Sequence, residues 1–308
     1  MAPPGTLDGA RVLFTGAGGQ LGAYLPAALR AAGAQPVSAG HREGPGIDLA
    51  ADLTRLGAAE RLIEDARPDL VIHGAAWTDV DGAERDPGGA RAMNVDAARW
   101  MAEACRARGV RLVAVSTDFV FSGQGGAPYP EDAASDPISV YGRTKRDGEL
   151  AVLAADPGFA VARTAWLYGG PAKHFPRTVL NVLAARGSIE VVDDESGSPT
   201  FAGDLADALV ALAAAGGAGI FHLANAGRAS RFELAQAVAW HAGFPVEWVQ
   251  PISTEGFLAK FPLPAARPAD SELRNIRAAD LGIVLRPWRA AIADYVPRLA
   301  RELGITPH

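Results

Sequence analysis

The chain has 308 residues, 49% of them apolar, and a formal net charge of −6, which is enough for one large α/β domain or two smaller ones. No stretch concentrates lysine and arginine, so a nucleic-acid-binding surface is not indicated. Cys105 is the only cysteine, which excludes an intrachain disulfide; the first residues do not resemble a signal peptide, and no run of about 20 continuously apolar residues occurs. We therefore expect a soluble protein of the reducing cytoplasm, with no nucleic-acid polymer and no membrane as partner.

The first half of the chain alternates short β-rich runs with alanine-rich helical runs. The expected strands cover residues 11–15, 35–39, 69–76, 110–117 and 158–166, and the expected helices cover residues 20–32, 58–67, 90–108 and 139–155. Alternation of this length predicts an α/β fold with a Rossmann-type, doubly wound parallel sheet that is covered by helices on both faces.

After Trp166 the pattern changes, because proline and glycine become frequent and loops separate the helices. The features expected there are helices at 175–186 and 204–215, a capping box "SRFE" at 230–233 that opens another helix, and a proline-rich loop at 261–270. We expect residues 1–166 to form the Rossmann domain and residues 167–308 to form mainly a smaller C-terminal lobe, with some segments returning to the sheet.

A glycine-rich turn, "TGAGGQLG" (15–22), lies where the first strand meets the first helix. Gly16, Gly19 and Gly22 suit a tight turn, a close backbone approach to a pyrophosphate and close packing of helix on strand. The start of the helix then offers free N–H groups to phosphates. The motif alone also fits a turn without a ligand, but its position between strand and helix predicts dinucleotide binding.

The end of the second expected strand bears on which dinucleotide is used. The sequence there is "VSAGHRE", in which Ala39 and Gly40 lack the carboxylate that would bind ribose hydroxyls and repel a 2′-phosphate. His41 and Arg42 can meet a phosphate, although Arg42 could equally be a solvated surface charge and Glu43 is close. The charges favour NADPH, and NADH is the alternative.

Tyr141 and Lys145 are four residues apart in the helix expected at 139–155, so they share one face. The chain has only five tyrosines and three lysines, which makes a chance pair uncommon; the alternative is a buried ring beside a solvated amine. A neighbouring ammonium lowers the pKa of a phenol, which would bring Tyr141 nearer to working pH as a proton donor. Lys145 would also hold the nicotinamide ribose.

A third polar group is expected at the carboxyl end of the strand at 110–117, where open α/β sheets bind ligands. "VAVSTDFVF" places Thr117 there, followed by Asp118. Thr117 could hydrogen-bond a substrate carbonyl, or could be an ordinary polar residue at the end of a strand.

These residues resemble the extended short-chain dehydrogenase/reductase superfamily and, within it, the dTDP-4-dehydrorhamnose reductase family. The resemblance runs from about Val12 to Trp288. Its landmarks are "TGAGGQLG", "VIHGAAWTDVDGAE", "STDFVFSG", "YGRTKRDGE", "RTAWLYG", "VVDDESGSPT" and "RPADSEL". The glycine turn and the Tyr-x-x-x-Lys pair occur throughout the superfamily, whereas the combination of "STDFVF", "RTAWLYG" and "DDESGSPT" is more specific to these reductases.

The resemblance implies a role for individual residues. It implies that Thr117, Tyr141 and Lys145 are catalytic, and that the substrate is bound by Thr117, Asp118, Trp166 and Arg267, the last through a diphosphate. Together with the glycine turn and the strand end, the cofactor-binding residues expected are Gly16, Gly19, Gln20, Leu21, Gly22, His41, Arg42, Asp52, Leu53, Ala75, Ala76, Trp77, Thr78, Tyr141 and Lys145.

Three positions separate this chain from related proteins. Nucleotide-sugar 4,6-dehydratases usually have Asp-Glu after the strand-end threonine, but here Asp118 precedes Phe119, so elimination lacks its second carboxyl group and reduction is favoured. Tyr24 replaces a glutamate that some relatives use in a magnesium-bridged dimer, so we expect no metal and not that dimer; a homodimer of another kind stays open. His73 replaces a more usual asparagine and receives no catalytic role.

The expected function is NADPH-dependent reduction of the C4 ketone of a dTDP-4-dehydro-6-deoxy-hexose, with dTDP-4-dehydro-β-L-rhamnose as the first candidate and dTDP-L-rhamnose as its product. One alternative is a 4-ketoreductase acting on another dTDP-deoxysugar in antibiotic biosynthesis. Another is a non-catalytic regulatory subunit resembling the accessory subunit of methionine adenosyltransferase, against which the intact Thr117, Tyr141 and Lys145 argue.

Overall fold

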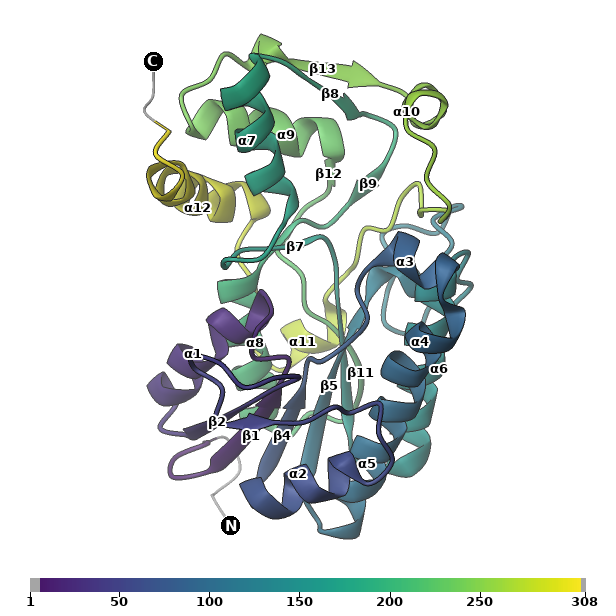
Figure 1. The fold of residues 1–308 in the computed structure, drawn as a ribbon, viewed down its shortest axis with the longest axis vertical. Coiled ribbons are helices and arrows are strands. Elements are labelled where there is room, and N and C mark those ends of the chain that lie inside the picture. Colours follow the sequence, from purple (N-terminus) through teal and green to yellow (C-terminus); the bar gives the residue numbers. More distant parts are fainter. Residues whose placement is uncertain (1–5, 306–308) are drawn as a thin grey trace.

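A seven-stranded parallel sheet forms the centre of the larger lobe in the computed structural model, which describes residues 6–305 (Figure 1). In spatial order its strands are β11 (Gly219–His222), β6 (Ala160–Thr164), β5 (Arg111–Thr117), β4 (Leu70–His73), β1 (Arg11–Thr15), β2 (Gln35–Gly40) and β3 (Leu49–Ala50). All neighbouring strands pair in parallel. The predicted doubly wound fold is confirmed.

Helices cover both faces of this sheet because its buried strands are apolar on both sides. In β1, Val12 and Phe14 belong to the core on one face and Leu13 belongs to the core on the other. The first face is covered by α1 (Leu25–Ala31), α8 (Ala202–Ala215) and α11 (Ile276–Asp280), and the second by α2 (Ala58–Ala66), α5 (Ala97–Ala107) and α6 (Val140–Ala155).

The smaller lobe packs three helices around its own apolar core (Figure 1). These helices are α7 (Phe175–Arg186), α9 (Arg231–His241) and α12 (Trp288–Glu302). Its short strands pair as β8 (Ile189–Val192) with β13 (Val249–Ile252), β7 (Leu167–Tyr168) with β10 (Thr200–Phe201), and β9 (Ser196–Gly197) with β12 (Ala229–Ser230). The α-helices of the whole molecule not yet named are α3 (Val80–Arg85), α4 (Pro87–Arg91) and α10 (Thr254–Lys260). Within residues 6–305, no helix has the length and apolar character needed to cross a membrane.

The strand order reverses between β1 and β4. The chain runs outward from β1 to β2 and β3 and then crosses back to β4 on the other side of β1, which opens a crevice at the carboxyl ends of these two strands. Residues after 167 also contribute to the large sheet through β11. We retain the division at residue 166 as a proposal about where the chain passes from the cofactor side to the substrate side.

Several predicted boundaries differ from the observed ones. The helix expected at 20–32 begins as a 3-10 turn at Leu21–Ala23, and α1 starts only at Leu25. The helix expected at 90–108 contains a π-helical turn at Ala92–Asp96 between α4 and α5. The strand expected at 158–166 ends at Thr164, because Trp166 has a φ of 45°, which an extended strand cannot accommodate. The capping box at the start of α9 is confirmed.

Candidate active site

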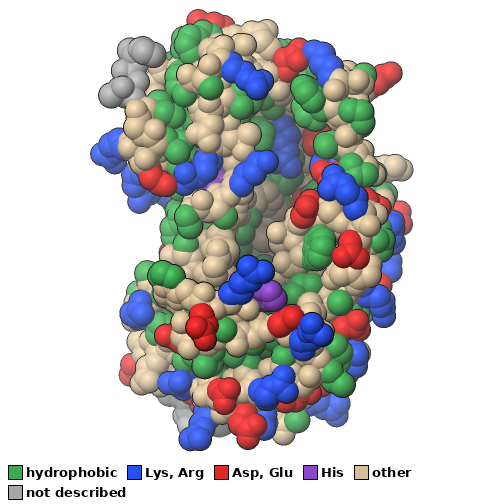
Figure 2. Space-filling model, in the orientation of Figure 1, with side chains coloured by type: hydrophobic (Ala, Val, Ile, Leu, Met, Phe, Trp, Pro, Cys, Tyr) green, Lys and Arg blue, Asp and Glu red, His purple; other side chains and the backbone are tan. Residues whose placement is uncertain are grey.

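A deep cleft separates the large sheet from the smaller lobe (Figure 2). Its volume is about 1330 Å³, and it includes the crevice at the ends of β1 and β4. The side chains predicted to be catalytic or substrate-binding all line it: Thr117, Asp118, Tyr141, Lys145, Trp166 and Arg267. The predicted cofactor residues line it too, except Gly22 and Arg42. The fold therefore brings together residues that lie up to 251 positions apart in the chain (16 to 267).

The glycine turn forms the floor of the cleft beside β1. Gly16 has a φ of 80°, and a Cβ there would lie 3.0 Å from the backbone of Gly74, so only glycine fits. Gly18, which was not singled out from the sequence, and Gly19 also line the cleft. Gly22 differs from expectation, because it is buried away from the cleft and a Cβ there would lie 2.3 Å from the carbonyl oxygen of Ala17. Its role is to close the turn by packing.

One end of the cleft carries the groups expected near an adenosine. His41, Asp52 and Leu53 line it, whereas Arg42 is exposed outside it, so the charge argument for NADPH rests on His41 alone. The Asp52 carboxylate accepts hydrogen bonds from the Thr54 hydroxyl (2.6 Å) and amide (3.1 Å) and lies 3.9 Å from His41 Nδ1. The hydroxyl contact is the main reason why the pKa of Asp52 is lowered.

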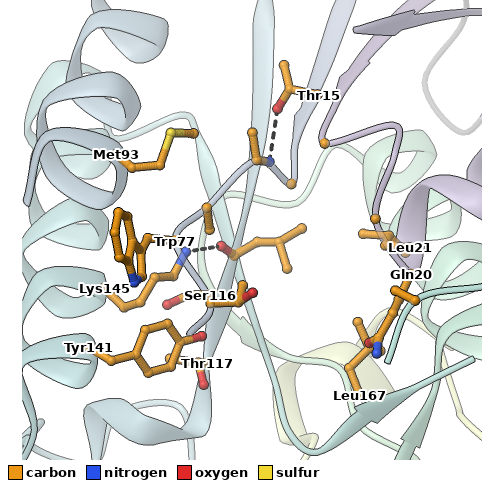
Figure 3. A pocket seen from close by; sticks show the side chains of 18 of the residues that line it. Thr15, Gln20, Leu21, Trp77, Met93, Ser116, Thr117, Tyr141, Lys145 and Leu167 are labelled. Atoms are coloured by element: carbon orange, nitrogen blue, oxygen red, sulfur yellow. Dashed lines mark hydrogen bonds between the residues drawn. The ribbon is translucent and has the colours of Figure 1, made fainter. Parts of the chain in front are cut away.

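The segment Ala75–Thr78 is held in place by a residue that the sequence did not single out. Asn94, on the π-helical turn, accepts from the Trp77 amide (2.8 Å) and donates to the Trp77 carbonyl (3.2 Å). Its amide also donates to the Thr144 hydroxyl on α6 (3.1 Å). At the other end of the segment, the Ala75 amide donates to the Thr15 hydroxyl (3.1 Å; Figure 3). The cleft wall is thus tied both to β1 and to the helix that carries the tyrosine–lysine pair.

Tyr141 and Lys145 project from one face of α6 into the cleft (Figure 3). Ser139 caps this helix by accepting from the Gly142 amide at 3.1 Å. Lys145 Nζ donates to the carbonyl oxygen of Val115 in β5 at 2.8 Å, and Tyr141 lies beside Thr117 at the end of the same strand. The structure therefore brings Thr117, Tyr141 and Lys145 together, as the sequence predicted.

The expected effect of Lys145 on Tyr141 is wrong for this structure. Burial raises the pKa of Tyr141 to about 12, and the Asp118 charge also raises it, although the Thr117 hydroxyl opposes the shift. Burial lowers the pKa of Lys145 to about 8. The sequence could not show how strongly both groups are desolvated. At neutral pH the phenol keeps its proton, which is the form that a proton donor needs.

Asp118 is buried behind Thr117. It accepts hydrogen bonds from the Thr117 hydroxyl (3.0 Å) and the Ser271 hydroxyl (2.5 Å), and burial raises its pKa to about 6 despite these contacts. Ser271 follows the proline-rich loop, so this bond links the loop to the end of β5. Asp118 therefore orients Thr117 and anchors the substrate side of the cleft.

A buried ionic network supports Lys145 from behind. Glu149, one helical turn beyond Lys145, accepts from Arg163 Nε (2.9 Å) and a terminal nitrogen (2.7 Å), and from the Ser116 hydroxyl (2.5 Å). Its negative charge raises the pKa of Lys145, opposing the larger effect of burial. The network thus helps to keep the ammonium charged.

The far wall of the cleft carries two arginines. Arg267 forms a two-pronged salt bridge with Asp81, with contacts of 2.7 and 3.3 Å. Arg231, which the sequence did not single out, stacks on the indole of Trp166 with its guanidinium carbon 3.5 Å from the ring centroid.

Tyr24, at the position of the absent glutamate, accepts from the Gly170 amide at 3.1 Å and packs on Phe201, so it has a structural role here.

Sequence reasoning missed residues that act through long-range contacts, namely Asn94, Glu149, Arg163, Arg231 and Ser271. Two of them carried a usable signal. Glu149 is four residues after Lys145 within "YGRTKRDGE", a spacing that predicts contact on a helix, and Arg231 is the second residue of the capping box. Ser271 and Arg163 lie within the landmarks "RPADSEL" and "RTAWLYG", but no local spacing shows that they contact Asp118 and Glu149.

Comparison with known proteins places the chain among sugar-nucleotide enzymes. The model of a family described as RmlD substrate binding domain matches residues 10–301. The dTDP-4-dehydrorhamnose reductase of Mycobacterium tuberculosis is 44% identical over 96% of this chain and 95% of its own length. A probable dTDP-4,6-dihydroxy-2-methyloxan-3-one 4-ketoreductase of Streptomyces antibioticus is 42% identical, covering 93% of this chain and 95% of that protein.

A solved structure agrees with these matches. The dTDP-4-dehydrorhamnose reductase of Bacillus anthracis in complex with NADP superposes with a TM-score of 0.85 and 32% sequence identity, and the match covers 93% of this chain and 98% of that one. The likeness therefore extends over both lobes and the cleft between them.

Proposed function

The chain belongs to the RmlD substrate binding domain family, and from that premise we propose that it reduces the C4 ketone of a dTDP-4-dehydro-6-deoxy-hexose. Its predicted family and its assignment to the NADPH-dependent oxidoreductases are confirmed. The proposal concerns the substrate and the roles of individual residues. It is carried by one observation: Thr117, Tyr141 and Lys145 meet in a single cleft. Burial, which raises the pKa of Tyr141, is consistent with a phenol that keeps its proton at neutral pH.

The cleft residues fit a dinucleotide. The position of a Cβ at Gly18 has no neighbour within 4 Å, so the turn leaves open space for a phosphate. His41 and Asp52 line the cleft just after β2 and β3, and Lys145 lines it beside β5. When bound, NADPH supplies the hydride for the reduction. Lys145 would hold the ribose next to the nicotinamide.

The proton chemistry belongs to the chain's own residues. As the ketone oxygen gains negative charge, Tyr141 donates its phenolic proton to that oxygen, and the alcohol forms. The Lys145 ammonium stabilises the phenolate left behind. The Thr117 hydroxyl, which donates to Asp118 in this structure, would turn its single proton to the ketone oxygen and hold that oxygen in place. Asp118 lies behind Thr117 and is followed by Phe119, so no second carboxyl group stands ready for elimination.

The first candidate substrate is dTDP-4-dehydro-β-L-rhamnose, which would give dTDP-L-rhamnose. The M. tuberculosis relative supports this choice by its name and its 44% identity. A second candidate is another dTDP-4-keto sugar, because the S. antibioticus relative is almost as similar, at 42%. An accessory-subunit role is disfavoured, since such a protein would have no need of Tyr141 and Lys145 in an open cleft.

The test is a panel of dTDP-4-keto sugars incubated with the purified protein and NADPH. Oxidation of the cofactor is followed by absorbance, the product is identified by NMR, and substrates are ranked by kcat/KM. We expect the rhamnose precursor to rank first and its C4 carbon to carry the new hydrogen. A folded protein that binds NADPH but oxidises it with no member of the panel would contradict the proposal.

A further inference from the structure

Arg231 occupies an unusual place in the cleft wall. It is the first residue of α9, on the smaller lobe, and its side chain is 22% exposed, with the exposed part facing the cleft. The guanidinium lies over Trp166, and the ring of Phe175 is 5.5 Å away. An arginine stacked on an indole in this way is held in one orientation by its flat face.

The hydrogen-bonding groups of Arg231 are unused. Within residues 6–305, no acceptor lies within hydrogen-bond distance of its side chain; the nearest carboxylate oxygen is that of Glu195, 3.8 Å from Nε. A guanidinium has five N–H donors in its plane, and stacking on an indole leaves them free. Burial lowers the pKa of Arg231 to about 10, so it stays cationic at neutral pH. The charges of Glu195 and Asp118 offset part of the cost of burying this cation, but neither carboxylate is within hydrogen-bond distance, so the N–H donors are left for a ligand to fill.

A second guanidinium faces the same space. Arg267 also lines the cleft and is close enough to Arg231 for its charge to lower the Arg231 pKa, although burial lowers that pKa more and the charges of Glu195 and Asp118 raise it. Arg267 is fixed by Asp81, whereas the carboxyl group near Arg231, Glu195, has a pKa raised by burial. Two arginines that repel each other across one cleft suit a ligand group with two negative charges and many acceptor oxygens.

The local backbone is built to hold this arrangement. Trp166 has a φ of 45°, a conformation that is rare for a large side chain and that is typical of functional sites. Gly197 lies against the indole, and a Cβ there would come within 2.6 Å of the ring. The indole and the guanidinium stacked on it are therefore positioned by two independent backbone features.

We propose that Arg231 binds the diphosphate of the sugar nucleotide together with Arg267, and that it thereby determines specificity for nucleoside diphosphate sugars. This inference rests on the proposed function, because it assigns a residue to the substrate of that reaction. Arg231 lies on the lobe opposite the glycine turn, so its role is in substrate binding and not in cofactor binding.

The experiment compares the binding of dTDP and thymidine to the NADPH-loaded protein by calorimetry. We expect the wild type to bind dTDP at least tenfold more tightly than thymidine, and Arg231→Met to lose about 10- to 100-fold in dTDP affinity with thymidine affinity unchanged. Arg231→Lys keeps the positive charge but not the planar set of N–H donors, so it should lose less dTDP affinity than Arg231→Met. Arg289→Met is the matched control, because Arg289 also stacks on a tryptophan, Trp288, at 4.4 Å, but lies outside the cleft.

The outcomes separate this inference from the proposed function. Wild-type affinity for dTDP in Arg231→Met, or no preference of the wild type for dTDP over thymidine, would overturn the role of Arg231 even if the keto sugar is reduced. Conversely, a wild type that reduces no keto sugar but binds dTDP through Arg231 would leave the inference standing and remove the proposed reaction. Unchanged NADPH affinity and melting temperature show that a variant is folded. If Arg231→Met does not fold, the dTDP and thymidine affinities of Arg231→Lys are compared with those of the wild type instead.

Discussion

The buried pair of Glu149 and Arg163 behind Lys145 predicts that two substitutions shift the pKa of Lys145 in opposite directions. Glu149 holds a negative charge one helical turn from the ammonium and is itself paired with Arg163. Glu149→Gln removes that charge, so the pKa of Lys145 should fall further below about 8. Arg163→Met removes the competing cation, so Glu149 should attract Lys145 more strongly and raise its pKa.

The size of the effect follows from the geometry. Charged groups one helical turn apart are separated by about 6 Å, and at an effective dielectric constant near 20 they attract by about 3 kcal/mol. Arg163 shares the Glu149 carboxylate, so we assign about half of this attraction to Lys145. At about 1.4 kcal/mol per pKa unit, that half corresponds to a shift of about one unit in the pKa of Lys145.

The assay is the pH dependence of kcat/KM for the keto sugar. Because the cationic form of Lys145 is required, activity should fall as pH rises through about 8 in the wild type. In Glu149→Gln the fall should begin about one unit lower, and in Arg163→Met it should begin at higher pH. Each single variant leaves a buried charge unpaired and should lose about 3–5 kcal/mol of stability. The double variant removes both charges, so it serves as the control for effects of an unpaired buried charge on stability. If the fall of kcat/KM at high pH stays at the same pH in both single variants, or shifts in the same direction in both, this role of the network is refuted.

Two further predictions concern glycines, with Gly44→Ala as the shared control because a Cβ there meets nothing within 4 Å. Gly22→Ala places a Cβ 2.3 Å from the Ala17 carbonyl oxygen and should reduce the free energy of unfolding by about 1–3 kcal/mol and weaken NADPH binding; unchanged denaturant melts and cofactor titrations would contradict this. Gly197→Ala should push the Trp166 indole away and raise KM for the sugar nucleotide about tenfold or more without changing NADPH affinity; steady-state kinetics with an unchanged KM would remove Trp166 from the substrate site.

Features encoded by local sequence could be predicted. The glycine turn, the helix that carries Tyr141 and Lys145, and Thr117 at the end of β5 all follow from neighbouring residues, because spacing and periodicity determine them. The parallel sheet follows in the same way from the alternation of strands and helices. The cleft could be expected at the carboxyl ends of the strands for this reason.

Features that depend on distant contacts could not be predicted. The pKa of Tyr141 was expected to fall and instead rises, because burial of the ring depends on segments far away in the chain. Arg42 and its neighbour His41 are both exposed, but only His41 lines the cleft, a difference that no motif encodes. Trp166 ends β6 through its positive φ, although its sequence continues a β-rich run.

The proposed reduction depends most on Tyr141 as the proton donor, and Tyr141→Phe tests this role most directly. The phenylalanine keeps the ring and its edge contact with Phe119, whose centroid is 5.4 Å away, so the fold and the cofactor site should be preserved. We predict that kcat falls by a factor of about 10² to 10⁴ while the Kd for NADPH stays within about threefold of the wild type. A variant that turns over the keto sugar at close to the wild-type rate would contradict the account.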